Sequence, residues 1–374
     1  MPPLARRNLF HDKVRLVVTL TGIVFAVVLI VVEVGLFMGF TTTTSTLIDH
    51  SGADLWITSE HVPYIEQGVQ FSERKLYQVR ATPGVEHAEK IVVAWGAWQH
   101  PDGRRESVQM VGIDPDDVFL RPWNMVEGSV GDLKRPDAII LDEMYKSKLG
   151  VTGVDQVFDI NDRRARVVGF THGIRTFTTL PYIFTRYKLA QEYARIPEDK
   201  TVYILARVSP GASLEQVRRT IAANVKDVEV LTRSEFSRMT RFYWMFTTGA
   251  GIAVLLAALL GLVVGFVVVA QTIYATTVDH LKEFGTLKAM GAPNRYVYKV
   301  ILTQAAMSAV IGYAMGMVAS GFVVHASQKG GASILLPAPM AVGMFFVTLF
   351  MCMGAALLSI HKVTRLDPAM VFKG

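Results

Sequence analysis

Glu33 is the ionisable side chain whose position in this sequence most directly suggests chemistry. It lies about two-thirds of the way along the apolar stretch of residues 16–40, with Met38 close behind it. A carboxylate at such depth in a membrane span costs on the order of a few kcal/mol and is usually paired or functional. Two interpretations are open. Glu33 could reach water or a backbone donor near the outer leaflet, or contact a ligand in a cavity between two copies of the chain.

A charged, glycine-punctuated segment, residues 273–299, lies between two long stretches without Asp, Glu, Lys or Arg. Apolar residues recur in it at helical spacing, which predicts an amphipathic helix. Gly291 followed by Pro293 is typical of a helix end. A helix resting on lipid headgroups would favour Lys and Arg on its polar face. Asp279 and Glu283 among the cations instead favour a protein partner.

The sequence carries no motif for catalysis by this chain alone. It lacks a G-x-x-x-x-G-K-[ST] phosphate loop, H-E-x-x-H and G-x-S-x-G, and its nine histidines show no metal-ligand spacing. The single cysteine, Cys352, excludes an intrachain disulfide. We therefore expect a chain that is not an enzyme and has no metal or cofactor of its own. Any energy must come from a partner.

The elements that position these residues are predicted to be membrane spans. Of 374 residues, 51% are hydrophobic and 19% are charged, and the mean hydropathy is +0.33. Roughly 20 apolar residues cross a hydrocarbon core about 30 Å thick. The predicted spans are residues 16–40, 248–274, 300–324 and 338–360. The end of a predicted stalk begins at residue 242 and leads into the second span. The first is expected to remain as an anchor, because its apolar core is too long for a signal peptide and no cleavage site follows.

The distribution of Lys and Arg predicts the orientation of the spans. Basic residues gather in an amphipathic N-terminus (1–15), in the segment 275–299 and in the tail 361–374, so these parts are expected in the cytoplasm. Residues 41–241 and the loop 325–337 are then expected outside. Much of the net charge of +6 lies in the inward-facing flanks, so we expect no nucleic-acid partner.

The external insert, residues 41–241, is predicted to be a mixed α/β domain. Its ends have patterns of strand-helix-strand-strand and of strand-helix-strand, which predict one lobe built from both ends and a second lobe from the middle, residues 118–196. Residues 234–246 keep a helical composition and run toward the second span without Gly or Pro. A continuous helix there would connect the domain rigidly to the membrane. The alternative is a linker with an interfacial anchor.

Small residues recur every fourth position in the second span, and other spans carry shorter repeats of the same kind. Such spacing lets helix backbones approach closely, either in a homodimer or within one bundle, and both alternatives are open. The residues are Gly249, Ala253, Ala257, Gly261 and Gly265, with the pairs Gly35 and Gly39, and Gly312 and Gly316.

The segment TTVDHLKEFGTLKAMGA, residues 276–292, closely resembles the signature of the FtsX-like, MacB-type ABC transporter permeases, most of all their DevC-type branch. In that family a pair of opposite charges precedes Gly-x-Leu-Lys/Arg-Ala-x-Gly-Ala, and RLDPAMVF resembles the closing motif. Many relatives have Glu-Arg where this chain has Asp279 and His280, which affects the expected polar contacts. The matching residues are Lys282, Glu283, Gly285, Leu287, Lys288, Ala289, Gly291, Ala292, Pro368 and Ala369.

The resemblance implies four transmembrane helices with a large mixed α/β extracytoplasmic domain between helices 1 and 2. Residues 275–299 would be a coupling helix bound to a separate ABC ATPase dimer that carries ATP and Mg, with two permease copies per complex. ATP-driven movement of this helix would shift the external domains, a mechanism called mechanotransmission. The residues implied at the ATPase contact are Asp279, His280, Lys282, Glu283, Phe284, Gly285, Leu287, Lys288 and Gly291.

The resemblance also implies a function and a place in the cell. The expected role is export of a glycolipid-like or hydrophobic substrate across a bacterial inner membrane, with a periplasmic membrane-fusion adaptor and an outer-membrane channel, and both termini cytoplasmic. One alternative is an adaptor-free exporter of haem or a lipophilic toxin, for which Glu33 and Met38 would be ligands. Another is an FtsX-like signalling subunit that activates a cell-wall hydrolase and transports nothing.

Overall fold

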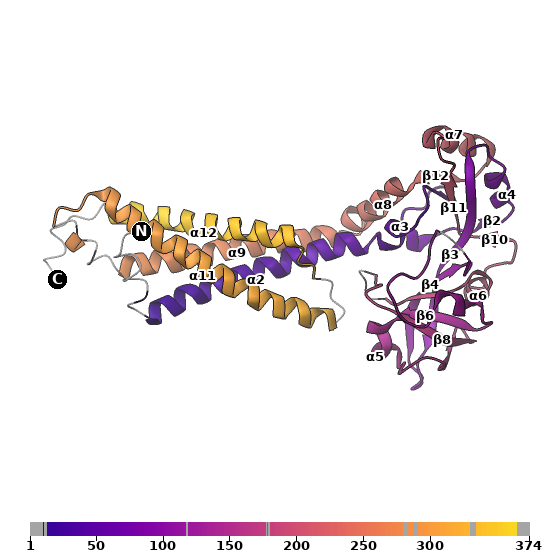
Figure 1. The fold of residues 1–374 in the computed structure, drawn as a ribbon, viewed down its shortest axis with the longest axis horizontal. Coiled ribbons are helices and arrows are strands. Elements are labelled where there is room, and N and C mark those ends of the chain that lie inside the picture. The colour runs from indigo at the N-terminus through magenta and orange to yellow at the C-terminus, as the bar shows by residue number, and fades with distance from the viewer. Residues whose placement is uncertain are drawn as a thin grey trace. The chain divides into compact units, whose positions relative to one another are not determined.

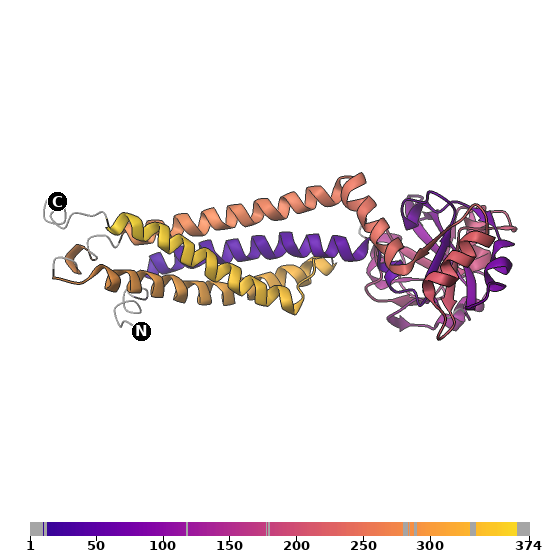
Figure 2. The same cartoon turned by 90° about the horizontal axis from the view of Figure 1, so that it is seen from above.

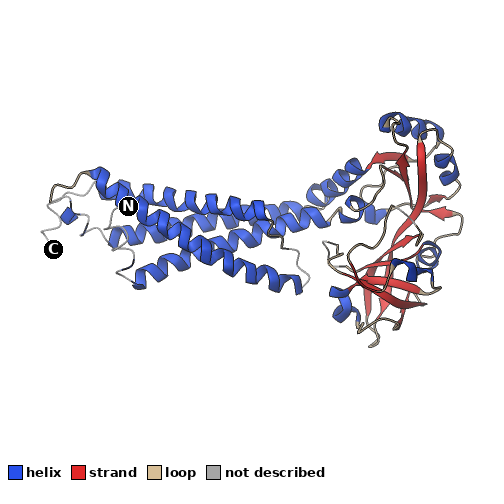
Figure 3. Ribbon diagram, in the orientation of Figure 1, coloured by secondary structure: helices blue, strands red, loops and turns tan. Residues whose placement is uncertain are grey.

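The chain forms two compact units, a helical one and one that contains the strands (Figure 3). The computed structural model describes residues 10, 13–116, 119–176, 178, 180–279, 283, 285–287, 290–329 and 334–364. The helical unit comprises Met1–Gly39 and Ile252–Gly374, and the α/β unit comprises Phe40–Gly251. The chain passes between them through its first and second long helices.

Among the described residues of the helical unit there are four long apolar helices, which confirms the four predicted spans (Figure 1). They are α2 (Lys13–Thr43), α9 (Ala250–Asp279), α11 (Asn294–Lys329) and α12 (Ala338–Thr364). Long uncharged runs form helices here because a helix satisfies its own backbone polar groups where no water is available. Each helix extends beyond the predicted span at one end or both, and α11 begins at Asn294 rather than at residue 300.

Helix α2 packs against both α9 and α11. In Figure 2 it lies between these two helices. On α11, a Cβ atom added to Gly312 would lie 2.5 Å from Ile23 Cγ2, and one added to Gly316 would lie 2.7 Å from Val27 Cβ. Only glycine fits such an approach. For this pair, the close contact therefore lies within one bundle.

The α/β unit is built on a sheet of ten strands with the order β12-β1-β11-β3-β4-β9-β6-β8-β5, and β7 pairs with β3 and β8. A short pair, β2 and β10, lies apart from it. The strands are β1 (Leu55–Thr58), β2 (Phe71–Ser72), β3 (Val85–Gln99), β4 (Arg105–Ile113), β5 (Met125–Glu127), β6 (Ala138–Asp142), β7 (Val157–Ile160), β8 (Arg163–Thr171), β9 (Tyr182–Arg186), β10 (Lys200–Thr201), β11 (Tyr203–Val208) and β12 (Glu229–Thr232).

Two lobes share the long strand β3. The first contains strands from both ends of the insert, and the second contains β4 together with the strands of the middle. The first part of β3 pairs with β11 and the second part with β4. In the first lobe, β1, β11 and β12 share a core with α4 (Lys75–Arg80) and α7 (Leu214–Asn224). The second lobe contains β4 to β9 with α5 (Lys146–Leu149) and α6 (Tyr187–Tyr193). Short helices precede and connect these strands: α3 (Thr46–Asp49), η1 (Ile65–Gln67), η2 (Val130–Lys134) and η3 (Glu143–Tyr145).

The prediction of a continuous helix from residue 234 into the second span is wrong. Helix α8 (Arg233–Phe242) gives way to one turn of π-helix, η4 (Tyr243–Thr247), and Gly249 then takes a φ of +73° before α9 begins. Thr248 N–H accordingly donates to Tyr243 O at 3.1 Å, five residues back. A left-handed residue interrupts a right-handed helix, and glycine adopts this conformation without the strain that a Cβ atom would cause.

Candidate functional site

The predicted coupling segment ends as its sequence indicates. Gly291 has a φ of +90°, Met290 N–H donates to Thr286 O, and Ala292 N–H donates to Leu287 O, both at 3.0 Å. The bond from Ala292 back to Leu287 around a left-handed glycine is the six-to-one bond of a Schellman motif. The structure thus confirms a helical end at Gly291.

The described residues of this segment present a polar side and an apolar side. Asp279, the last residue of α9, and Glu283 are exposed, whereas Gly285 is buried. Leu287 is half-buried and packs against the apolar core of the helical unit. Acidic groups are therefore accessible to a partner on a segment that is anchored to the spans. The other residues of the predicted contact, His280, Lys282, Phe284 and Lys288, lie outside the described residues.

The small residues of the second span do not share one face. A Cβ atom added to Gly261 would lie 3.1 Å from Glu33 Cγ, and one added to Gly265 would lie 3.0 Å from Ile30 Cδ1, so both pack on α2 of the same chain. Ala253 is exposed and Ala257 is half-buried. At 3.6 residues per turn, a four-residue repeat drifts by about 40° per step, so its far end has turned away. For Gly261 and Gly265, the contact lies within the bundle.

Sequence reasoning missed a second contact between α2 and α9. Thr19 Oγ1 and Thr276 Oγ1 are hydrogen-bonded at 3.0 Å. A Cβ atom added to Gly22 would lie 2.8 Å from Thr272 Oγ1, so this glycine also permits a close approach. The sequence pattern that could have indicated this contact is Thr272 and Thr276, which lie four residues apart on one helical face. Their partners on the first span are Thr19 and Gly22. Together with the Gly261 and Gly265 contacts, this joins α2 to α9 at separate points along their length.

Glu33 and Met38 are not brought together as ligands. Both lie on the continuous helix α2 and are half-buried. Five residues at 3.6 per turn place two side chains about 140° apart around the helix axis. Glu33 packs on α9 at Gly261. A single ligand therefore does not meet both side chains from one copy of the chain.

The π-helix at the end of the α/β unit is held by a group of residues that the sequence did not reveal. The Tyr64 ring stacks on Tyr243 with centroids 4.2 Å apart and meets Trp244 edge-on at 5.2 Å. Beside them, Glu66 is only 6% exposed. Burial raises the pKa of Glu66 from its ordinary value of 4.5 to about 7, against the opposing effects of its own peptide N–H and of the Trp244 indole. An ionisable group therefore lies against the turn at which the helix toward the second span is interrupted.

Two protein-family models match this chain. Residues 16–224, more than half of the chain, match the MacB-like periplasmic core domain, and residues 255–368 match the FtsX-like permease C-terminal domain. The chain is an ABC transporter permease of the MacB and FtsX type. Because permeases of this class work with an ABC ATPase, a partner ATPase is implied, and the four spans make the permease a multi-pass membrane protein.

Relatives of the permease match it along its whole length at low identity. An uncharacterized ABC transporter permease of Mycobacterium tuberculosis is 24% identical, and one of Mycobacterium bovis is 22% identical, with 99% of both chains covered in each case. Among solved structures, the periplasmic region of MacB from Actinobacillus actinomycetemcomitans aligns with a TM-score of 0.39 and 10% identity, covering 50% of this chain and 92% of that one. The extracellular domain of YknZ, a noncanonic ABC-type transporter from Gram-positive bacteria, aligns with a TM-score of 0.36 and 12% identity, covering 48% and 98%.

Proposed function

We propose that this permease works by mechanotransmission, with residues 275–299 as its contact to the ATPase. The observation that carries the proposal is the helical end at Gly291, where Leu287 anchors the segment in the helical unit while Glu283 stays exposed. Such a segment can be pushed by a partner without losing its attachment to the spans. ATP and Mg would be bound by the ATPase, and two copies of the permease would face an ATPase dimer.

The contacts between α2 and α9 supply the route for the movement. These two helices are the ones through which the chain continues into the α/β unit. The Thr19–Thr276 hydrogen bond and the packing of Gly261 and Gly265 hold them against each other. Because close-packed interiors transmit displacement, a shift at the coupling segment is passed to both connections.

The proposed cargo is amphiphilic, glycolipid-like or hydrophobic, exported with a membrane-fusion adaptor and an outer-membrane channel as in the DevC branch. In this proposal the α/β unit lies in the periplasm and both termini lie in the cytoplasm, as the positive-inside rule predicts. The two-lobed α/β unit of residues Phe40–Gly251 offers a large surface for cargo or adaptor. Haem export through Glu33 and Met38 is less well supported, because the helical register points these side chains in different directions.

The test is co-purification of the ATPase with two variants of the coupling segment. Glu283→Lys reverses an exposed charge, and Gly285→Trp places a large ring at a buried position. We expect each to reduce the recovered ATPase by about tenfold or more, because a loss of about 1.4 kcal/mol in binding free energy weakens the affinity for the ATPase tenfold. The matched controls are Glu198→Lys, an exposed acid in the α/β unit, and Gly321→Trp, at a helical glycine with open space around it.

Normal ATPase recovery with both coupling variants would contradict the assignment of this segment. The proteins recovered with the wild-type permease then test the rest of the proposal. An ATPase together with a membrane-fusion adaptor supports export. An ATPase with a cell-wall hydrolase in place of an adaptor supports the signalling alternative.

A further inference from the structure

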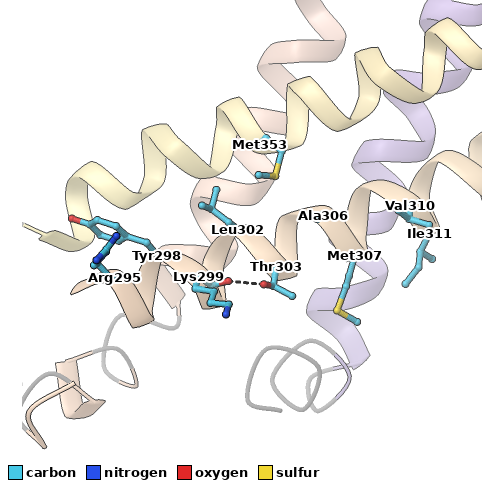
Figure 4. Close-up of a pocket in the computed structure, with 10 residues that line it drawn as sticks. All are labelled: Arg295, Tyr298, Lys299, Leu302, Thr303, Ala306, Met307, Val310, Ile311 and Met353. Carbon is cyan, nitrogen blue, oxygen red and sulfur yellow. Dashed lines mark hydrogen bonds between the residues drawn. The ribbon is translucent and has the colours of Figure 1, made fainter. Parts of the chain in front are cut away.

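A large apolar groove runs along the first half of α11 (Figure 4). Its volume is about 880 Å³, toward the upper end of the range of roughly 300–1,000 Å³ for ligand pockets. Residues of α11 form almost all of its wall, and Met353 of α12 closes one side. The apolar lining consists of Leu302, Ala306, Met307, Val310, Ile311 and Met353.

One end of the groove is basic. Arg295 and Lys299 lie there one helical turn apart, with Tyr298 beside them, whereas Val310 and Ile311 lie at the other end (Figure 4). Both basic side chains are exposed, and neither forms an ion pair within the part of the chain that the structure describes. The groove thus has, at one end, two positive charges without an ion-pair partner among the described residues, and its remaining wall is largely apolar.

The length of the groove fits one leaflet of a bilayer. From Lys299 to Ile311 the helix rises by about 18 Å at 1.5 Å per residue. Half of a hydrocarbon core about 30 Å thick is about 15 Å. The basic residues therefore lie at headgroup depth when Leu302 to Ile311 lie among the acyl chains.

We propose that this groove binds one anionic phospholipid, with its phosphate at Arg295 and Lys299 and its acyl chains along α11. That the leaflet is the cytoplasmic one rests on the orientation given under the proposed function, but binding itself does not. Pro293 accepts a hydrogen bond from Tyr296 N–H at 2.9 Å at the start of α11, so Ala292 and Pro293 link the lipid site directly to the coupling segment. A bound lipid would hold the start of this helix.

Charge favours a lipid over a second copy of the chain. At the end of the bundle that carries Arg295 and Lys299, the sequences flanking the other spans are also basic, with Lys13 and Arg15 before the first span and Lys362 after the last. A second copy packed along the groove in parallel would bring like charges together. A phosphate brings the opposite charge, worth on the order of 1 kcal/mol for each basic residue near an anionic surface.

Native mass spectrometry of the delipidated full chain in detergent tests the proposal. The probes are palmitoyl-oleoyl phosphatidylglycerol and the zwitterionic phosphatidylcholine with the same chains, titrated separately. We expect Arg295→Gln and Lys299→Gln each to weaken phosphatidylglycerol binding about fivefold, equivalent to about 1 kcal/mol, with little effect on phosphatidylcholine. Ala306→Phe fills the apolar part and should weaken binding of both lipids. Lys13→Gln, an exposed basic residue on α2, and Val318→Phe, an exposed position farther along α11, are the matched controls.

Two results would overturn the proposal. One is equal retention of both lipids in the wild type and both glutamine variants, which would mean unspecific solvation of an apolar surface. The other is a dimer that Ala306→Phe dissociates without any change in lipid retention, which would assign the groove to a second copy. Neither result depends on ATPase recovery, so failure here is distinguishable from failure of the proposed function.

Discussion

Glu66 shows how one buried carboxyl can make a domain sensitive to pH. Its Oε2 atom is buried and has no hydrogen-bond partner within the described part of the chain. Ionising such a group in an apolar environment is unfavourable, which is why its pKa is raised. Since Glu66 lies against Trp244 of the π-helix, its protonation state bears on the segment that leads to the second span.

We predict that Glu66→Gln removes a pH dependence of stability. With a pKa raised from 4.5 to about 7, the native state binds more protons than the unfolded state between these values. The free energy of unfolding therefore falls as the pH rises from about 4.5 to about 7, by at most about 3 kcal/mol. The variant should match the wild type near pH 4 and be more stable near pH 8.

Intrinsic tryptophan fluorescence during thermal unfolding of the full chain measures this effect. All 5 tryptophans lie within Phe40–Gly251, so the signal reports the α/β unit alone. Glu60→Gln, at an exposed position, is the control and should follow the wild type at every pH. If the midpoint of the wild type changes with pH no more than that of Glu66→Gln between pH 4.5 and 7, the pKa of Glu66 is not raised.

At the scale of elements, the break at Gly249 separates what the sequence could predict from what it could not. Long apolar runs predicted the spans, and strand and helix patterns at both ends of residues 41–241 predicted an α/β domain, because these are local patterns. Gly249 fits a repeat of small residues, and this repeat predicts a packing residue there. Its left-handed φ follows a π-helix in which Tyr243 stacks on Tyr64, a residue distant in sequence, and such a contact leaves no local pattern.

The candidate site was predictable to a similar extent. The end of the coupling segment at Gly291 follows from residues adjacent in sequence, and it was predicted correctly. The partners of Gly261 and Gly22 on neighbouring helices depend on helix rotation, which a four-residue spacing does not define. Glu66 was missed because nothing in its local sequence indicates burial.

The break itself gives a prediction at this scale. Gly249→Ala should strain the backbone by about 1–2 kcal/mol, because an L-residue in the left-handed region brings its Cβ against the following carbonyl. No other atom lies within 4 Å of the added Cβ among the described residues, so backbone strain is the only steric effect in the folded state. We expect the tryptophan-detected midpoint to fall by about 2–4 °C per kcal/mol in a unit of this size.

Gly153→Ala serves as the matched control for this variant. It lies in the same unit, has equally open surroundings and has no positive φ, so its midpoint should not fall. If Gly249→Ala behaves like this control, the interruption of the helix is not required by the fold.

At the scale of the whole molecule, the question is whether α2 and α9 move as one body during the ATPase cycle. They are the two chain connections between the units, and they are joined by the Thr19–Thr276 hydrogen bond at one point and by Gly261 against Glu33 at another. Mechanotransmission through a joined pair requires no separation of the two helices. A cargo path opening between them would require it.

A reversible crosslink distinguishes these possibilities. In a Thr19→Cys, Thr276→Cys variant, the two thiols would replace hydroxyls that lie 3.0 Å apart. The natural Cys352 is buried, and replacing it with Ser gives a background without other thiols. Because the helices are expected to move together, oxidation should leave the rate of ATP hydrolysis by the assembled complex within about twofold of the rate in the reduced state. This corresponds to a change of less than about 0.5 kcal/mol in activation free energy. The single variants under oxidant are the controls. Loss of hydrolysis on oxidation that a reductant restores would mean that α2 and α9 must part during the cycle, and the route from coupling segment to α/β unit would then run through α9 alone.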